Sequence, residues 1–375
     1  MTRFVANAGA SGNVAIAPRR SPSAFHARLP SYERTPLVPA PALADELGVA
    51  EVEVKDESHR LGLPAFKMLG ASWATFRALE ARAGGSLDGW RTIDELRLAV
   101  EPLGPLTLAC ATEGNHGRAV ARMARLAGLD AHIVVPAHVA APRVDAIRDE
   151  GGRIETVDGT YEDAVARSAD LIGERTIVVS DTAWPGYEEI PEWVIEGYST
   201  IFEEIAQDGA APDVVAVQMG VGSLAATAIR HFRGRDPANV QEKTTGFIPP
   251  GRSRVRVLGV EPLAAACVMA SIERGEMVTV PGPHDSSMGG LNCGRPSTVA
   301  WPDLSAGLDG VVAIDDDAAR AAIDRLAALG LESGPSGAAG LGGLLALADV
   351  PGARERLGLS ATSRVLVLNT EAATA

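Results

Sequence analysis

Cysteines are scarce in this sequence, and their scarcity limits the folds and sites that it can form. Its 375 residues include three, Cys110, Cys267 and Cys293. Three thiols are too few for a disulfide-based fold, and their spacing lacks the CxxC pairs typical of zinc sites. We therefore expect no metal site and interpret the cysteines as small buried side chains. A contact between Cys267 and Cys293 stays open.

Long apolar segments and an excess of positive charge are also missing. The longest nearly apolar stretch, residues 335–348, is shorter than the roughly 18 residues of a membrane span, and residues 1–20 lack the apolar core of a secretory signal. The 34 basic residues are outnumbered by 48 acidic ones, and a net charge of −14 repels nucleic-acid phosphates and anionic membrane surfaces. We expect a cytoplasmic protein that binds neither nucleic acid nor membranes.

The sequence is rich in glycine and alternates regularly between strand and helix patterns. Aromatic residues make up 4% of the chain, whereas it has 40 glycines, which suits a closely packed α/β protein with many tight turns. From about residue 104, short β-branched segments alternate with helical patterns, as in βαβ units around a parallel sheet. Strands are predicted at 106–111, 131–135, 153–157, 177–180, 214–218, 255–260, 311–314 and 364–368, and helices include 118–127, 139–150 and 161–173.

Lys67 is the first of three features that carry chemistry. It lies in an apolar stretch, residues 61–72, where a helix is predicted to begin. A lysine in such a place is desolvated, which favours the neutral amine and prepares it to attack a carbonyl carbon. The alternative is a helix-starting lysine whose ammonium group reaches water.

Two glycine-bracketed turns are the other features, and both follow predicted strands. The first, residues 112–117, leads into a helix whose exposed amides can bind an anionic oxygen. The second, residues 220–224, reads Gly-Val-Gly-Ser-Leu at a helix N-terminus, where N–H groups and the helix dipole favour a phosphate. Each turn alone is also compatible with an ordinary strand-to-helix connection. With the lysine, they favour a ligand with an aldehyde, a phosphate and ring substituents, namely pyridoxal 5′-phosphate (PLP).

The order of these motifs resembles that of the fold-type II PLP enzymes, the group of tryptophan synthase β and threonine dehydratase. The matching segments are residues 66–71, 112–117, 220–224 and 332–338, within a resemblance that spans residues 32–371. It implies an α/β fold with two parallel-sheet domains, helices on both faces of the sheets, and PLP between the domains. We predict a large PLP-binding domain from residues 1–84 and 200–375, and a small inserted domain at residues 85–199.

Further segments resemble the diaminopropionate ammonia-lyase family within that group. They are residues 181–187 with 190–193 and 197–198, residues 288–294, and residues 369–371. This resemblance implies a PLP-dependent ammonia-lyase that converts a small amino acid, 2,3-diaminopropionate, by α,β-elimination to pyruvate and ammonia, and a homodimer. Two alternatives stay open: a serine or threonine dehydratase, and a PLP-binding protein without turnover. Kinetics on these substrates must separate them.

The resemblance implies roles for single residues in cofactor binding. Lys67 matches the lysine that forms a Schiff base with PLP and moves the Cα proton, and Phe66 is expected beside the cofactor ring. Asn115 matches the residue that hydrogen-bonds the phenolic oxygen, and Thr370 matches a hydroxyl near the pyridine nitrogen, a neutral partner that suits β-elimination. The phosphate turn comprises Gly220, Val221, Gly222, Ser223 and Leu224.

Two carboxylates are further catalytic candidates. Asp181 matches an aspartate that faces the substrate, where it can receive the second amino group of a diamino acid; alternatively it caps a turn after a strand. Glu113 stands where this family generally has Asp, as the acid or base on the substrate face opposite the lysine. Glutamate extends the carboxylate by one methylene, and a shift of about 1 Å in a catalytic group can cost 10²-fold in rate. The use of the D-isomer is therefore in question.

Overall fold

The computed structural model describes residues 2–11, 14, 20–234 and 254–373. The polar stretch 241–254, which the sequence suggests is a surface insertion, lies outside the described residues except for its last position. The chain forms two compact units. Unit 1 contains Met1–Arg20, Arg34–His59 and Ile201–Ala373, and unit 2 contains Ser21–Glu33 and Arg60–Thr200.

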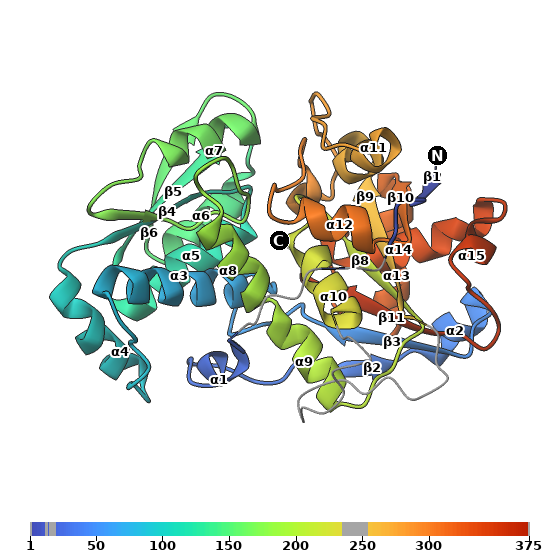
Figure 1. Ribbon diagram of the computed structural model, residues 1–375, viewed down its shortest axis with the longest axis horizontal. Coiled ribbons are helices and arrows are strands. Elements are labelled where there is room, and N and C mark those ends of the chain that lie inside the picture. The colour runs from blue at the N-terminus through green and yellow to red at the C-terminus, as the bar shows by residue number, and fades with distance from the viewer. Residues whose placement is uncertain (1, 12–13, 15–19, 235–253, 374–375) are drawn as a thin grey trace. The chain divides into compact units, whose positions relative to one another are not determined.

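Unit 1 is built on a seven-stranded sheet with the order β1-β10-β9-β8-β11-β3-β2 (Figure 1). The five central strands are parallel, and the short edge strands β1 and β2 pair antiparallel with β10 and β3. The strands are β1 (Arg3–Ala6), β2 (Leu37–Pro39), β3 (Glu51–Asp56), β8 (Val214–Gln218), β9 (Arg256–Pro262), β10 (Gly310–Ile314) and β11 (Arg364–Asn369).

Both faces of this sheet are buried. Successive side chains of a strand point to opposite faces, so Val214 and Ala216 lie on one face and Val215 and Val217 on the other. The first pair belongs to a core cluster with Leu344, and the second pair is equally inaccessible to solvent. The helices that begin within unit 1 are α2 (Pro41–Leu47), α10 (Ser223–Arg233), α11 (Cys267–Arg274), α12 (Trp301–Gly307), α13 (Asp316–Ala328), α14 (Pro335–Ala346) and α15 (Ala353–Arg356).

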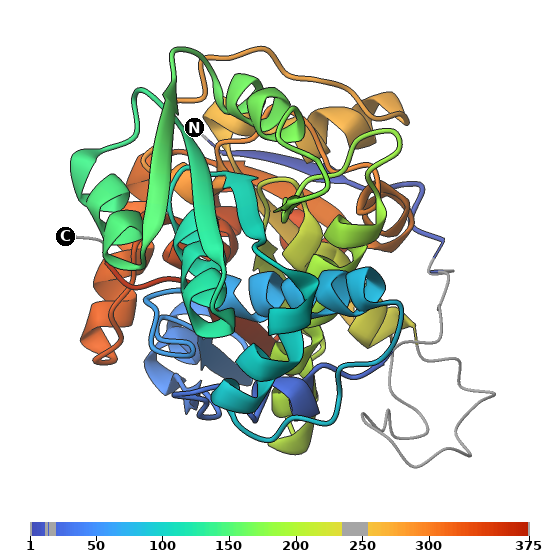
Figure 2. The same ribbon diagram turned by 90° about the vertical axis from the view of Figure 1, so that its left-hand side faces the viewer.

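Unit 2 has a four-stranded parallel sheet with the order β6-β5-β4-β7, whose teal and green strands lie side by side in Figure 2. Its strands are β4 (Thr107–Ala111), β5 (Asp130–Pro136), β6 (Gly152–Val157) and β7 (Thr176–Val178). Its helices are α1 (Ser23–His26), α3 (Lys67–Ala83), α4 (Ile93–Val100), α5 (Asn115–Ala127), α6 (Ala141–Asp149), α7 (Tyr161–Ala169) and α8 (Glu189–Gly197), and α9 (Ser199–Gln207) continues into unit 1.

Close packing of α3 against α8 fixes the start of α3. A Cβ atom on Gly70 would lie 2.6 Å from the Tyr198 ring, and one on Gly197 would lie 2.5 Å from the carbonyl oxygen of Leu69. Only glycine permits so close an approach at these two positions. Residues 60–84 therefore pack with unit 2, although the sequence-based domain boundaries put them, and residues 21–33, with the larger domain.

The predicted βαβ pattern is confirmed, with differences at its edges. Every predicted strand has a counterpart in β4 to β11. The strands β1 to β3 were not predicted: β1 and β2 are edge strands of three or four residues, too short to show a period. Residues 83–105 mix glycine, tryptophan and charged residues, a pattern that predicts irregular structure. The stretch nevertheless contains α4, which Thr92 caps by accepting a hydrogen bond from the N–H of Glu95.

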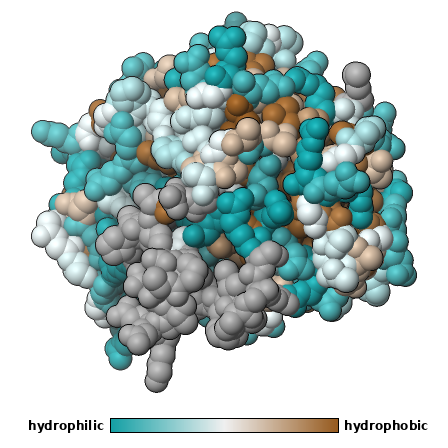
Figure 3. Space-filling view, turned by 45° about the vertical axis from the view of Figure 1, so that its right-hand side comes forward, coloured by the Kyte–Doolittle hydropathy of each residue, from teal (hydrophilic) through white to brown (hydrophobic). Residues whose placement is uncertain are grey.

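One face of the molecule is described by a space-filling view. Figure 3 shows one face that carries mainly hydrophilic side chains, with hydrophobic ones in smaller groups. No helix in the described part of the chain is long and apolar enough to cross a membrane.

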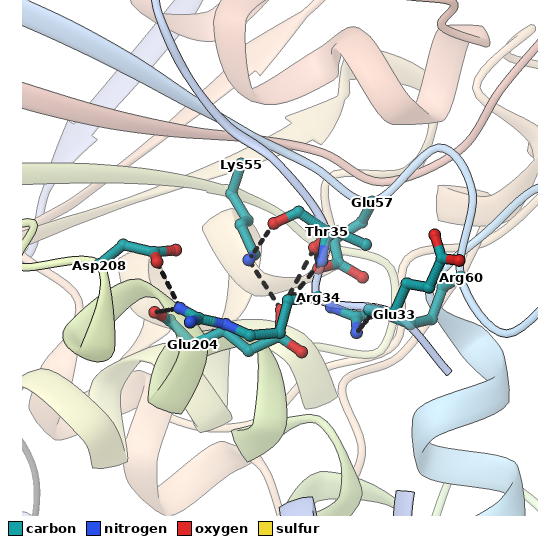
Figure 4. A network of polar contacts seen from close by, with 8 residues as sticks. All are labelled: Glu33, Arg34, Thr35, Lys55, Glu57, Arg60, Glu204 and Asp208. Carbon is teal, nitrogen blue, oxygen red and sulfur yellow. Dashed lines mark hydrogen bonds and ion pairs between the residues drawn. The ribbon is translucent and has the colours of Figure 1, made fainter. Parts of the chain in front are cut away.

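A buried polar network joins the N-terminal segment of unit 1 to α9 (Figure 4). The Lys55 ammonium group lies 2.8 Å from Glu204 Oε2 and donates to the carbonyl oxygen of Thr35, and the Thr35 hydroxyl donates to Glu57 Oε1 at 2.6 Å. The Lys55 and Glu204 side chains are 0% and 2% exposed. Since water cannot solvate these buried charges, each charge is stabilised by the other.

Replacing Lys55 with methionine should therefore destabilise unit 1. The change leaves the buried Glu204 carboxylate without its countercharge, which costs about 3–5 kcal/mol. Arg325→Met is the matched control, because it removes the exposed pair with Glu46 at 3.0 Å, and such pairs contribute about 0–1 kcal/mol. Urea unfolding measures both losses. Equal losses in the two variants would contradict the importance of the buried pair.

Candidate active site

Lys67 is the first residue of α3 in unit 2, and its side chain is mostly buried. The Nζ atom donates a hydrogen bond to Asp181 Oδ2 at 2.8 Å. The rings of Phe66 and Tyr198 lie with their centroids 5.4 and 5.9 Å from Nζ. Burial raises the pKa of the Tyr198 phenol to about 12, although the charge of Lys67 opposes this shift. The structure thus brings together Lys67 and Asp181, two of the three catalytic candidates.

Two tyrosines hold Asp181 in the loop after β7. The hydroxyl of Tyr161, the first residue of α7, donates to Asp181 Oδ1 at 3.3 Å. The hydroxyl of Tyr187 donates to the carbonyl oxygen of Val178 at 2.6 Å and accepts from the N–H of Ser180 at 3.0 Å. Tyr187 thus fixes the backbone immediately before Asp181, whereas Tyr161 contacts the carboxylate itself.

The Asp181 carboxylate is held in its ionised form. Burial by itself would raise its pKa, but the charge of Lys67, the nearby His116, and hydrogen bonds from Lys67 and Tyr161 together lower the pKa well below its ordinary value. The site therefore presents a fixed negative charge at hydrogen-bond distance from a primary amine. A carboxylate placed in this way can bind an ammonium group of a ligand.

The turn between β4 and α5 is closed by its own threonine. The Thr112 hydroxyl accepts hydrogen bonds from the N–H groups of Gly114 and Gly117, at 2.9 and 3.0 Å. Asn115 therefore begins α5 in a fixed position. Burial lowers the pKa of His116, whose Nε2 lies 2.7 Å from the carbonyl oxygen of Val179. We therefore assign His116 a structural hydrogen bond.

Glu113, the third catalytic candidate, has a different partner. Its carboxylate lies 3.3 Å from Nε2 of His138, in the loop after β5, and Arg143 donates to its backbone carbonyl oxygen at 3.2 Å. Within the described residues, the hydrogen bond of this carboxylate goes to His138 and not to the pair formed by Lys67 and Asp181.

In unit 1, the predicted phosphate turn connects β8 to α10. Gly222 has a φ of +95°, and a Cβ atom there would lie 2.4 Å from Leu304 Cδ1. A Cβ on Gly220 would lie 3.0 Å from the sulfur of Cys293. Both glycines are thus required by the path of the backbone, which enters α10 at Ser223. A tight turn at the N-terminus of an 11-residue helix can bind a phosphate.

Thr370 follows β11 and is oriented by Gln218 at the end of β8. Gln218 Nε2 lies 2.8 Å from both Thr370 Oγ1 and the carbonyl oxygen of Gly337, and 3.1 Å from that of Leu368. Because the neighbouring carbonyl oxygens only accept, the amide nitrogen must face them and donate. The Thr370 oxygen therefore accepts from Gln218, and its hydrogen stays available for an acceptor such as an unprotonated ring nitrogen.

Comparison with known proteins identifies the class to which this fold and these residues belong. The model of the pyridoxal-phosphate dependent enzyme family matches residues 29–371. The chain belongs to this family, and its cofactor is PLP. The predicted fold-type II architecture is confirmed.

The relatives include ammonia-lyases and a dehydratase. Diaminopropionate ammonia-lyase of Escherichia coli strain K12 is 33% identical over 369 residues, covering 92% of this chain and 86% of that enzyme. A crystal structure of the Escherichia coli enzyme in complex with D-serine has a TM-score of 0.87 and 31% identity, covering 100% of this chain and 94% of that one. L-threonine dehydratase of Mycobacterium leprae is 31% identical over 252 residues, covering 65% of this chain and 54% of that enzyme.

Each unit contains groups that can bind a part of PLP. Unit 2 supplies the amine of Lys67, and unit 1 supplies the glycine turn and the hydroxyl of Thr370. The described residues contain no group of three or more His, Cys, Asp or Glu side chains that could hold a metal ion. The three cysteines are thiols, of which Cys110 and Cys267 are buried.

The sequence did not reveal the residues that position these groups. They are Tyr161 and Tyr187 at Asp181, Gln218 at Thr370, and His138 at Glu113. For Gln218 a signal was available, because a polar residue at the end of an apolar strand, directly before a glycine turn, is unusual. Tyr161 and His138 act on residues 20 and 25 positions away in the chain, which local patterns do not show.

Gly222→Ala should weaken PLP binding at least about tenfold, the equivalent of about 1.4 kcal/mol, because the new methyl group meets Leu304. Gly275→Ala is the control: Gly275 has a similar φ of +72°, but no atom lies within 4 Å of its Cβ position. It carries the same backbone strain, of order 1–3 kcal/mol, without the collision. Titration of the cofactor-free variants with PLP measures both affinities. Unchanged affinity in Gly222→Ala would remove the turn from the cofactor site.

Proposed function

We propose that the protein is a PLP-dependent ammonia-lyase that converts 2,3-diaminopropionate by α,β-elimination to pyruvate and ammonia. The observation that carries this proposal is the position of the Asp181 carboxylate, 2.8 Å from the Nζ atom of Lys67 that would hold PLP. A diamino acid brings a second ammonium group, for which such a carboxylate is a suitable partner. The similarity to diaminopropionate ammonia-lyase over 92% of the chain supports the same substrate.

Lys67 and Asp181 have different roles in the reaction. PLP, when bound, supplies the electron-withdrawing ring that makes the Cα–H bond acidic. Lys67 holds PLP through its aldehyde and takes the Cα proton on its face of the substrate. Asp181 pairs with the β-amino group and favours its protonated form, because a nearby negative charge raises the pKa of an amine. A protonated amino group leaves as neutral ammonia, so Asp181 promotes the breaking of the Cβ–N bond.

The other candidates complete the site. Glu113 is the acid or base on the substrate face opposite Lys67. Phe66 lies beside the cofactor ring, Asn115 hydrogen-bonds its phenolic oxygen, and Thr370 donates to the pyridine nitrogen. The phosphate is bound by the turn Gly220, Val221, Gly222, Ser223 and Leu224. Lys67, Glu113 and Asn115 belong to unit 2, and the turn and Thr370 belong to unit 1.

A serine or threonine dehydratase is the second candidate, supported by the similarity to L-threonine dehydratase. The β-hydroxyl of serine or threonine is neutral and gains less from an ionised Asp181 than an ammonium group does. A PLP-binding protein without turnover is a third possibility, which release of pyruvate would exclude. We also propose that the protein is a cytoplasmic homodimer with a small amino acid as its ligand; its three thiols suit a reducing compartment.

Asp181→Asn tests the proposed substrate. It keeps the size of the side chain but removes its charge, so kcat/KM for 2,3-diaminopropionate should fall about 10²–10⁴-fold, the usual contribution of an acid or base group. The weaker activity on serine should fall less. Asp145→Asn, which changes an exposed aspartate paired with Arg148, is the control and should behave as wild type. Pyruvate release measures all rates. A wild-type preference for serine or threonine would overturn the proposal.

A further inference from the structure

The contact between Glu113 and His138 has no part in the roles assigned so far. Glu113 directly precedes the glycine that caps α5, and its side chain is 13% exposed, whereas that of His138 is 58% exposed. Nε2 of His138 lies 3.3 Å from Glu113 Oε1. His138 therefore connects a half-buried carboxylate with solvent.

The backbone at Glu113 is fixed by other contacts. Arg143 donates to the Glu113 carbonyl oxygen, and its Cδ lies 3.2 Å from the position of a Cβ on Gly114, where φ is +152°. The side chain itself has three torsions, one more than an aspartate, and fixing each costs conformational entropy. In the described residues, the interaction that fixes the end of this side chain is the one with His138.

Charged groups on three elements surround the Glu113 carboxylate. Burial raises its pKa, and the hydrogen bond and charge of His138, followed by the charge of Arg143 in α6, lower it. Glu162 in α7 raises it again. His138 is thus the neighbour that most favours the ionised form, which is the form that can accept a proton.

We propose that His138 is the positioning residue for Glu113 and holds its carboxylate as the base that acts on the D-isomer of the substrate. This inference rests on the proposed function. Glu113 takes the Cα proton, the electrons of the Cα–H bond form the Cα–Cβ double bond, and the electron pair of the Cβ–N bond leaves with ammonia. The proton on Glu113 then returns to water at the exposed His138. The L-isomer gives its proton to Lys67 and does not need His138.

His138→Leu tests the proposal with both isomers of 2,3-diaminopropionate. For the D-isomer, kcat/KM should fall, and the acidic limb of its pH profile should move to higher pH, because the main interaction that lowers the pKa of Glu113 is gone. For the L-isomer, rate and profile should not change. His138→Gln restores an N–H donor and should recover part of the D-activity. His59→Leu is the matched control, since His59 is 68% exposed and lies 3.6 Å from Glu332.

A measurement without turnover accompanies the kinetics. The PLP-bound protein is labelled with ¹³C in its glutamate side-chain carboxyl groups. The NMR signal of Glu113 is assigned as the one that is present in the wild-type spectrum and missing from that of Glu113→Gln. Its titration midpoint should move to higher pH in His138→Leu and stay unchanged in His59→Leu.

The outcomes separate the two proposals. If the wild type releases pyruvate from neither isomer, the proposed function fails, and the NMR midpoint alone decides whether His138 controls Glu113. If both isomers react but His138→Leu keeps the wild-type D-profile and midpoint, the positioning role is overturned. Retention of D-activity in Glu113→Gln, or a wild type that uses only the L-isomer, would overturn it as well.

Discussion

The contact between Lys67 and Asp181 is the interaction on which the proposed chemistry of this protein depends. An amine at the start of α3, placed near two aromatic rings, meets a carboxylate that two tyrosines position. The surrounding helices and strands position these two side chains. Glycines at positions 70 and 197 let α3 and α8 approach closely, which brings Tyr198 to the amine, and the short strand β7 ends where the loop of Asp181 begins. A fixed charge in a buried site results.

The two units contribute different kinds of chemistry. Unit 2 provides ionisable groups, which suit proton transfer and recognition of a charged substrate. Unit 1 provides neutral groups, namely a glycine turn at a helix N-terminus and a threonine hydroxyl that Gln218 orients. In the role proposed for Thr370, a neutral hydroxyl leaves the ring nitrogen of PLP unprotonated, which moderates its electron-withdrawing power and favours elimination over transamination.

Local sequence patterns predicted most of the strands, Lys67 and the two glycine turns. The family resemblance supplied the other candidate residues, and neither source showed their partners. Lys67 and the turn at Gly220 are recognisable because a strand, a glycine turn and a helix follow each other directly. The partner of Lys67 lies 114 residues away, and Gln218 lies 152 residues from Thr370. Such contacts arise from strand order and helix packing, which a single sequence does not display. Glu113 shows this limit of single-sequence prediction most clearly. The glutamate in place of the family's aspartate is visible in the sequence, but its contact with His138, 25 residues further along the chain, is not.

The ratio of products tests the central claim most directly. Elimination from 2,3-diaminopropionate releases the β-amino group, and hydrolysis of the remaining product releases the α-amino group. The purified protein with PLP should therefore form two ammonia molecules for each pyruvate from this substrate, and faster than it forms pyruvate from serine. Absence of pyruvate, or equal amounts of ammonia and pyruvate from 2,3-diaminopropionate, would contradict the assignment of the Cβ–N bond as the one that breaks.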